Sequence, residues 1–148
     1  MLLKAYGIMG GTFDPIHNGH LRMAEAALEQ LGLDEVLFIP DGDPPHKEEL
    51  ASASDRLEMV ELAIKGRYGF RTLDMEVMRA GQTYTVDTLE RLKADSPSDQ
   101  FTYIVGADTL ARIESWRNFP RVASLLAGIA FAPRADVSAA EAELQRQQ

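Results

Sequence analysis

The sequence predicts one α/β domain built on an open parallel sheet. Two observations predict it: apolar, β-branched runs alternate with segments whose apolar residues recur at helical spacing, and glycine or proline stands at most of the boundaries. The 148 residues, of which 45% are hydrophobic and 26% charged, match the size and composition of a single globular domain. We therefore expect one domain over residues 1–148, and the absence of cysteine excludes disulfide bonds.

The first half of the chain is expected to contain two strands and two helices. The first helix begins near Asn18 and ends at Gly32, with its apolar residues on one face. The second helix follows Ser54, a good N-cap residue, and ends near Gly66. Two adjacent prolines make residues 41–52 a loop. The strands expected in this half are residues 3–9 and 35–39.

The second half is expected to contain three strands separated by short helices. Thr85 is the expected N-cap of one helix. Residues 109–126 are predicted to form two short helices broken at Pro120. A capping-box pattern starts at Ser138, so residues 138–147 form either a helix or a frayed end. The strands expected in this half are residues 70–73, 101–105 and 128–131.

Three loops that follow predicted strands carry chemically active residues. They are residues 10–20, 41–47 and 106–108, and they include all three histidines of the chain. The carboxyl ends of parallel strands lie at one edge of a sheet, and ligands of open α/β sheets bind at that edge. We therefore expect these loops to converge on one site.

The two histidines of the first loop predict a phosphate-binding cradle. His17 and His20 are three residues apart at the start of a helix, so their side chains project to nearly the same side. The helix N-terminus adds unsatisfied N–H groups, and Gly19 has no Cβ to block a phosphate. Two alternatives stay open: one histidine is a surface residue and the other a helix cap, or the pair binds zinc together with His46.

The formal charge of −8 argues against a protein that binds duplex nucleic acid, because such proteins present a basic face. It permits small anionic ligands, which a few local donors can hold. No stretch approaches the ~20 apolar residues of a membrane helix, and the N-terminal apolar run is too short for a signal peptide. We expect a cytoplasmic protein that binds small anions rather than nucleic acid or membranes.

Residues 10–20, GGTFDPIHNGH, resemble the H-x-G-H signature of the nucleotidyltransferase superfamily, and more narrowly that of the bacterial nicotinate-nucleotide adenylyltransferases. Three further stretches agree with that family: residues 39–47 (IPDGDPPHK), residues 84–89 (YTVDTL), and residues 106–108 (GAD) with Trp116. The resemblance spans most of the chain. It implies a doubly wound, Rossmann-like nucleotidyltransferase fold and adenylyl transfer from ATP to nicotinate mononucleotide, a step of NAD biosynthesis.

The resemblance also implies a role for individual residues. Mg²⁺ would arrive with ATP, held by phosphate oxygens and water rather than by dedicated protein ligands. The expected catalytic residues, which contact and stabilise the phosphates, are His17, His20 and Lys47. The expected ATP-binding residues are Gly10, Gly11, Thr12, Phe13, Gly19, Gly106 and Asp108. The residues expected to bind the nicotinate nucleotide are His46, Tyr84, Thr85 and Trp116.

Several of these residues also have a structural interpretation. The Phe13 side chain is equally well explained as a core contact. Asp14 and Pro15 are expected to form a turn. Arg56 is either an anion contact or a solvated surface residue, and the polar neighbours of Trp116 favour a ring that faces a ligand over one packed in the core.

The sequence departs from the family pattern near its C-terminus. The family continues with a phosphate-binding run, I-S-S-T-x-I-R, whereas here Ala132-Pro133-Arg134 lead into an alanine- and glutamate-rich tail. The expected fold is therefore a C-terminally shortened one. Alternatives to the nicotinate enzyme are an adenylyltransferase for another phosphorylated acceptor, such as phosphopantetheine, and a non-catalytic nucleotide-binding relative. Homo-oligomer formation is left open.

Overall fold

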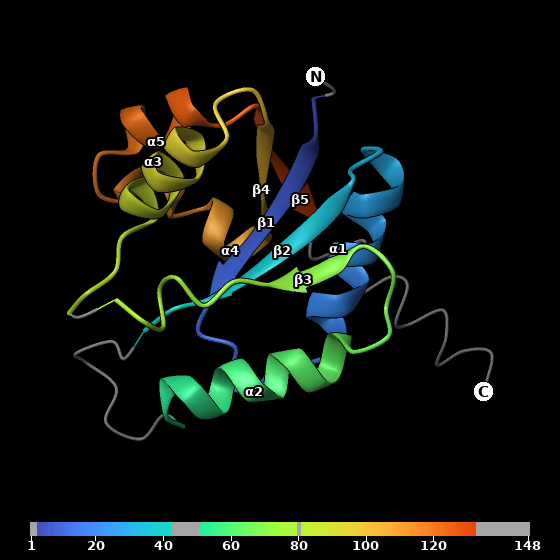
Figure 1. Ribbon diagram of the computed structural model, residues 1–148. Helices are drawn as coiled ribbons and strands as arrows, with labels where there is room; N and C mark the ends of the chain where they lie inside the picture. Colours follow the sequence, from blue (N-terminus) through green and yellow to red (C-terminus); the bar gives the residue numbers. More distant parts are fainter. Residues whose placement is uncertain (1–2, 43–50, 80, 133–148) are drawn as a thin grey trace.

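The computed structural model describes residues 3–42, 51–79 and 81–132, in which five parallel strands form one sheet (Figure 1). The order of the strands across the sheet is β3-β2-β1-β4-β5, and every neighbouring pair is parallel. This confirms the open, doubly wound parallel sheet. The strands are β1 (Ala5–Gly11), β2 (Glu35–Pro40), β3 (Phe70–Thr72), β4 (Gln100–Gly106) and β5 (Gly128–Ala132).

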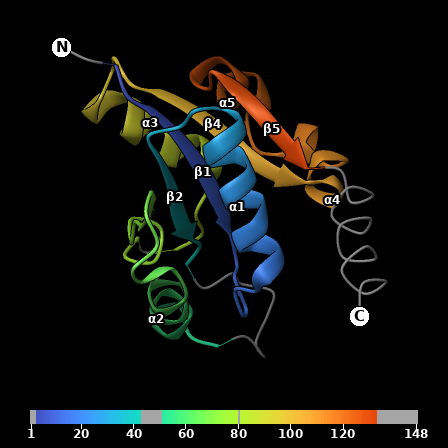
Figure 2. The same cartoon turned by 90° about the vertical axis from the view of Figure 1, so that its right-hand side faces the viewer.

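Helices cover both faces of the sheet. In the described residues they are α1 (Asn18–Gln30), α2 (Ala53–Ile64), α3 (Thr85–Asp95), α4 (Ala107–Leu110), the 3₁₀ turn η1 (Ile113–Ser115) and α5 (Phe119–Leu125). Figure 1 shows α3 and α5 side by side on one face, and Figure 2 shows α1 lying along the other.

Alternation along each strand divides the core into two layers. Successive side chains of a strand point to opposite faces, so Ile8 and Met9 belong to different clusters. The layer under α1 and α2 includes Met9, Val36, Phe38, Ile104, Leu21, Ala24, Val60 and Ile64. The layer under α3, η1 and α5 includes Ile8, Leu37, Ile39, Phe101, Val105, Val86, Leu89, Ile113 and Val122.

The connection of the strands creates a switch point between β1 and β4. From β1 the chain moves outward through β2 to β3, then returns to pair β4 with the other side of β1. The crossovers on the two sides of β1 therefore lie on opposite faces, with α1 and α2 on one and α3 on the other. A crevice at the carboxyl ends of β1 and β4 follows from this topology.

Several predicted boundaries were wrong by a few residues. The first strand runs from Ala5 through Gly11, because it stays paired with β2 as far as Pro40. The N-cap of α2 is Ser52, whose Oγ accepts the N–H of Asp55 at 3.1 Å, rather than Ser54.

The remaining corrections lie in the second half. Tyr84, and not Thr85, is the N-cap of α3. Pro120 lies in the first turn of α5, where its missing N–H costs nothing, so it begins a helix rather than breaking one. Helix α4 begins at Ala107, directly after β4. The tail at 138–147 lies outside the described residues. Among the described helices, none has the length and apolar character to cross a membrane.

The correction at Ser52 can be tested by stability. Replacing Ser52 by alanine removes the cap hydrogen bond and should lower the free energy of unfolding by about 1 kcal/mol. The exposed Ser54 in the first turn is the matched control, and Ser54→Ala should leave stability within about 0.5 kcal/mol of wild type. Urea unfolding of both variants measures the difference, and a larger loss in Ser54→Ala would contradict the assignment.

Candidate functional site

A cavity of about 730 Å³ opens at the carboxyl edge of the sheet, at the switch point between β1 and β4. Its wall combines the loop after β1, the start of α1, the end of β4 and the start of α4. Asp41, which follows β2, and Glu76, which follows β3, also line it. The predicted convergence of the loops after β1, β2 and β4 is therefore confirmed for the described residues.

His17 and His20 cap helix α1 reciprocally. His17 is the N-cap residue, and its Nδ1 accepts the N–H of Gly19 at 3.1 Å. His20 is the third helical residue, and its Nδ1 accepts the N–H of His17 at 3.1 Å. This arrangement is a capping box in which two imidazoles replace the usual hydroxyl and carboxylate.

The capping bonds decide which ring nitrogen faces a ligand. A nitrogen that accepts a backbone N–H presents its lone pair there, so in a neutral ring the proton is on Nε2. The two rings stack with their centroids 3.8 Å apart, and both line the cavity. His17 and His20 therefore offer a pair of neighbouring Nε2–H donors to an anion.

Gly19 is needed for a reason other than the predicted one. A Cβ at this position would lie 2.9 Å from Nδ1 and Cε1 of His17, so any side chain would displace that ring. Its N–H is also bonded to His17 and is not available to a phosphate in this arrangement. Gly19 thus makes room for an imidazole rather than for a phosphate.

Burial keeps His20 neutral. Desolvation, and secondly the neighbouring His17, lower the pKa of His20 to about 4. The ring of Phe13 contributes to this environment, since it meets the His20 ring edge-on with centroids 4.9 Å apart. At neutral pH His20 is therefore a hydrogen-bond donor without a positive charge.

The wall across from the histidines is aromatic and hydroxylic. Trp116 is half-buried, and its ring meets Tyr103 edge-on at a centroid distance of 5.2 Å. The side chains of Tyr103 and Thr85 hydrogen-bond to each other. Gly10 is next to them, where a Cβ would overlap the Tyr103 hydroxyl. Trp116 therefore packs against the core with one edge and lines the cavity with another, so both of its interpretations hold in part.

Comparison with known proteins identifies the family of the chain. A sequence profile described as cytidylyltransferase-like matches residues 8–138. A protein of Geobacter sp. (strain M21) named "probable nicotinate-nucleotide adenylyltransferase" is 50% identical over 122 residues, which are 80% of this chain and 56% of the relative. Relatives of the same name from Shouchella clausii and Synechococcus sp. (strain JA-2-3B'a(2-13)) are 42% and 45% identical, over 68% and 71% of their lengths. The chain belongs to the cytidylyltransferase-like family, in its nicotinate-nucleotide adenylyltransferase branch.

Solved structures show the fold of this branch again. The Plasmodium falciparum nicotinic acid mononucleotide adenylyltransferase complexed with NaAD superposes with a TM-score of 0.72, at 17% identity, over 88% of this chain and 75% of that one. The chain spans a little over half the length of the Geobacter relative.

The structure brings most of the residues predicted from the adenylyltransferase resemblance to one cavity. These are Gly10, Gly11, His17, Gly19, His20, Thr85, Gly106, Asp108 and Trp116. His46 and Lys47 lie outside the described residues.

Three of the predicted residues, Thr12, Phe13 and Tyr84, do not line the cavity. Phe13 has a φ of 50° and places its side chain in the core, 3% exposed, so the core interpretation is right for its ring. Thr12 donates its hydroxyl to Asp41 Oδ2 at 3.2 Å. The ring of Tyr84 lies under the guanidinium of Arg117, at 4.5 Å.

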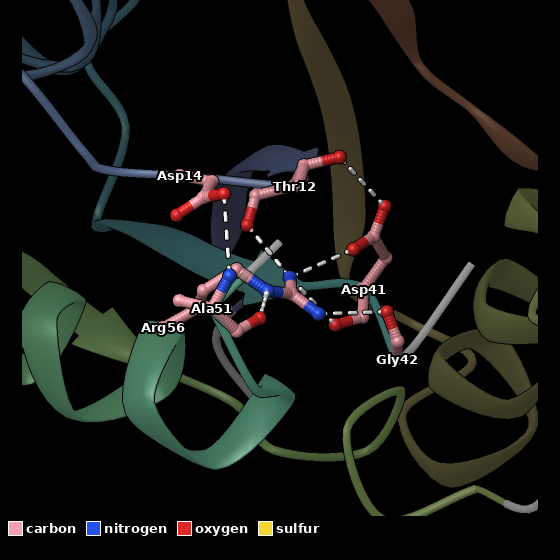
Figure 3. Close-up of polar contacts among 6 residues, drawn as sticks. All are labelled: Thr12, Asp14, Asp41, Gly42, Ala51 and Arg56. Carbon is pink, nitrogen blue, oxygen red and sulfur yellow. Dashed lines mark hydrogen bonds and ion pairs between the residues drawn. The ribbon is translucent and has the colours of Figure 1, made fainter. Parts of the chain in front are cut away.

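Arg56, expected to be either an anion contact or a solvated surface residue, is not a surface residue. Its side chain is fully buried, because it enters the space between the loop after β1 and the end of β2 (Figure 3). Nη1 pairs with Asp41 Oδ1 at 2.9 Å and donates to the Thr12 carbonyl at 2.7 Å. Nη2 donates to the Gly42 carbonyl at 2.8 Å, and Nε to the Ala51 carbonyl at 3.1 Å.

The expected turn at Asp14 and Pro15 is part of the same region. The peptide bond between them is cis, and the Asp14 carboxylate accepts the N–H of Ala51 at 3.4 Å. The loop after β1 is thus bonded to the chain just before α2 through both Asp14 and Arg56 (Figure 3).

Among the cavity residues to which the sequence assigned no site role are Asp41, Glu76 and Tyr103. The rule about strand ends singled out the loop 41–47 that begins with Asp41, but gave Asp41 itself no role. Tyr103 looked like an ordinary strand residue, and its hydroxyl reaches the cavity only because Gly10 leaves space. Glu76 lies four residues beyond the end of β3, in a segment to which the sequence assigned no motif.

Removing the Arg56 guanidinium should destabilise the fold strongly. Arg56→Met leaves the Asp41 carboxylate and several carbonyls without their donor, which should cost about 3–5 kcal/mol of unfolding free energy. Arg121→Met breaks an exposed ion pair with Glu90 and should cost less than about 1 kcal/mol. Chemical denaturation compares the two, and equal losses would show that the buried cluster is not stabilising.

The protonation of His20 can be followed directly. NMR titration should give His20 a pKa of about 4. In the unfolded chain the imidazole titrates near 6.5, so between these pH values the unfolded state binds more protons than the folded state. The stability that His20 contributes is therefore complete above about pH 6.5 and decreases as the pH falls toward 4. A His20 pKa near 6.5 in the folded protein would contradict the buried, neutral ring.

Proposed function

We propose that this protein transfers the adenylyl group of ATP to nicotinate mononucleotide, forming deamido-NAD and releasing pyrophosphate. The observation that carries the proposal is the pair of Nε2–H donors of His17 and His20 in a cavity that also contains the Trp116 ring. The names of the relatives support the same reaction. The fold is also that of the Plasmodium falciparum nicotinic acid mononucleotide adenylyltransferase, which has been solved in complexes with APC and with NaAD.

The reaction needs positioning and charge stabilisation rather than a covalent enzyme intermediate. A phosphate oxygen of the acceptor attacks the α-phosphorus of ATP, and the bond from that phosphorus to the bridging oxygen breaks. The bonding electrons leave with pyrophosphate. Because both reactants are anions, the barrier comes largely from repulsion and misalignment. Donors aimed at the phosphates lower it, and this is the proposed role of His17 and His20.

The cavity offers different chemistry for the two substrates. Gly10, Gly11 and Gly106 bring backbone close to the switch point, where the triphosphate and adenosine are proposed to bind. Asp108, at the start of α4, is the proposed acceptor for a ribose hydroxyl. On the other side, the Trp116 ring is proposed to stack on the nicotinate ring, beside Thr85 at the start of α3. His46 and Lys47 are proposed to contact the nucleotide and the phosphates, as the family resemblance implies.

Mg²⁺ is proposed to enter with ATP. The family resemblance implies that phosphate oxygens and water hold this ion. When bound, it neutralises part of the phosphate charge. The protein's own contribution is the orientation of its donors, with Nδ1 of each histidine fixed by a backbone N–H.

The proposal predicts acceptor-dependent pyrophosphate release that requires His20. His20→Ala should lower kcat by about 10²–10³, the effect typical of losing one donor to the transition state. The matched control is Glu25→Gln on the same helix, at an exposed residue that pairs with Arg67, and it should leave kcat unchanged. A coupled pyrophosphate assay with nicotinate mononucleotide, nicotinamide mononucleotide and phosphopantetheine as acceptors measures both variants.

The outcomes separate the alternatives. Release with phosphopantetheine alone would assign the protein to another acceptor. Binding of ATP without release in any mixture would identify a non-catalytic nucleotide-binding relative. Equal rates in wild type and His20→Ala would remove His20 from the mechanism.

A further inference from the structure

Glu76 is a buried carboxyl group on the cavity wall that the proposed chemistry does not use. The residue is 8% exposed, follows β3 and lines the cavity together with Thr83 and Thr85. Its Oε2 accepts the hydroxyl of Thr88 at 2.8 Å, and its side chain also hydrogen-bonds to Thr83. A carboxyl group is rarely buried in this way without a structural or functional reason.

The bond to Thr88 connects Glu76 to the first turn of α3. Thr88 is 2% exposed, and Arg79 Nη1 donates to the same hydroxyl at 3.5 Å. The N-cap residue Tyr84 makes no side-chain cap bond to the helix. The side-chain bond that holds the start of α3 therefore comes from inside the fold, from the hydroxyl of Thr88 to the carboxyl of Glu76, and not from the side chain of the N-cap residue.

Glu76 is also fixed from the side of β2. A Cβ on Gly42 would lie 3.0 Å from the Glu76 carbonyl oxygen, so the two backbone segments are in close contact. Gly42 is in turn held by the guanidinium of Arg56. Glu76 thus lies between a rigid base at the end of β2 and the wall that Thr83 and Thr85 form beside Tyr103.

We propose that Glu76 is a positioning residue for the acceptor nucleotide: through Thr88 and Thr83 it holds the wall of the cavity on which the acceptor binds. This inference rests on the proposed function, because that function assigns the acceptor to the side of the cavity with Thr85 and Trp116. Its consequence is that Glu76 controls the affinity for the acceptor and not the affinity for ATP.

The charge of Glu76 should also make the binding of the acceptor depend on pH. Burial raises the pKa of Glu76 most, and Asp41 raises it further, while hydrogen bonds from Thr88 and Thr83 and the charge of Arg79 oppose the shift. The other titratable group facing it is Tyr103, which burial keeps protonated. As the pH rises through the Glu76 pKa, a negative charge develops on the wall, and it should weaken the binding of an anionic acceptor.

Substitution of Glu76 by glutamine separates the effect of the hydrogen bond to Thr88 from the effect of the negative charge. Glu76→Gln keeps an oxygen that accepts the Thr88 hydroxyl but cannot ionise, whereas Glu76→Ala removes both the bond and the charge. Thr88→Val removes the hydroxyl donor while it keeps the shape of the side chain. Glu90→Gln, at an exposed position of α3 that pairs with Arg121, is the matched control.

Isothermal titration of nicotinate mononucleotide and of a non-hydrolysable ATP analogue, over a series of pH values, tests the proposal. Glu76→Ala and Thr88→Val should each raise the Kd for the mononucleotide about tenfold, since each removes the short hydrogen bond between Glu76 and Thr88 and leaves a buried polar group with one partner fewer. Their Kd for the ATP analogue, and both constants of Glu90→Gln, should not change. Glu76→Gln should bind the mononucleotide as wild type does at low pH, and more tightly than wild type as the pH rises.

Each outcome of the titration either supports or overturns the role proposed for Glu76. Equal weakening for both ligands, a Glu76→Gln variant as impaired as Glu76→Ala, or a wild type that does not bind the mononucleotide would overturn the proposal. If Glu76→Ala does not fold, Thr88→Val and Glu76→Gln carry the test. Mononucleotide binding that depends on Glu76, combined with no pyrophosphate release, would leave this inference standing while the proposed function fails.

Discussion

The site depends on one buried guanidinium. Taking the charge of Arg56 out of water is costly, and the cost is offset because its nitrogens bond to one carboxylate and several carbonyls. These acceptors come from the loop after β1, the end of β2 and the residue before α2, which are distant in sequence (Figure 3). The planar fork of arginine reaches acceptors in several directions at once, which a lysine ammonium on a flexible stem does not do. The guanidinium thereby holds the loops after β1 and β2, which border the cavity, in one arrangement.

Crowding between side chains, rather than access for ligands, explains two of the glycines. At Gly10 the space of a Cβ is taken by the hydroxyl of Tyr103, and at Gly19 by the imidazole of His17. In each case a glycine lets a larger side chain from elsewhere reach the cavity. The chemistry of the site is thus supplied by rings that lie over glycine backbone, and a substitution at either glycine acts on the ring and not on the ligand.

Hydrophobic periodicity and the loops after strands predicted the fold and the position of the site, because both depend on short-range patterns in the sequence. Periodicity located every described strand, and the loops after β1 and β4 converge since the carboxyl ends of parallel strands must. The same-side placement of His17 and His20 followed from helical spacing. Short-range patterns did not predict three features of the site. These are the capping bonds of the imidazoles, the left-handed backbone of Phe13 and the burial of Arg56.

The features that the sequence did not predict share a physical cause. The burial of Arg56 depends on three segments that meet only in the folded chain, and its position early in a helix suggested a solvated residue. Glu76 and Thr88 are twelve residues apart and belong to different elements, so their bond is a tertiary contact. The roles of the site residues toward ATP and the acceptor stay predictions, as do all statements about His46 and Lys47.

The proposed binding of polyanions by an acidic chain depends on the local charge of the site. With a formal charge of −8, the protein has no general attraction for phosphate, so the site must supply donors locally. His20 donates as a neutral ring, because its surroundings hold its pKa at about 4. A phosphate at Nε2 acts in the opposite direction, since an adjacent negative charge favours the imidazolium form. The second proton would have to add at Nδ1, which accepts the His17 N–H, so the capping bond opposes the imidazolium form and His20 is proposed to donate as a neutral ring.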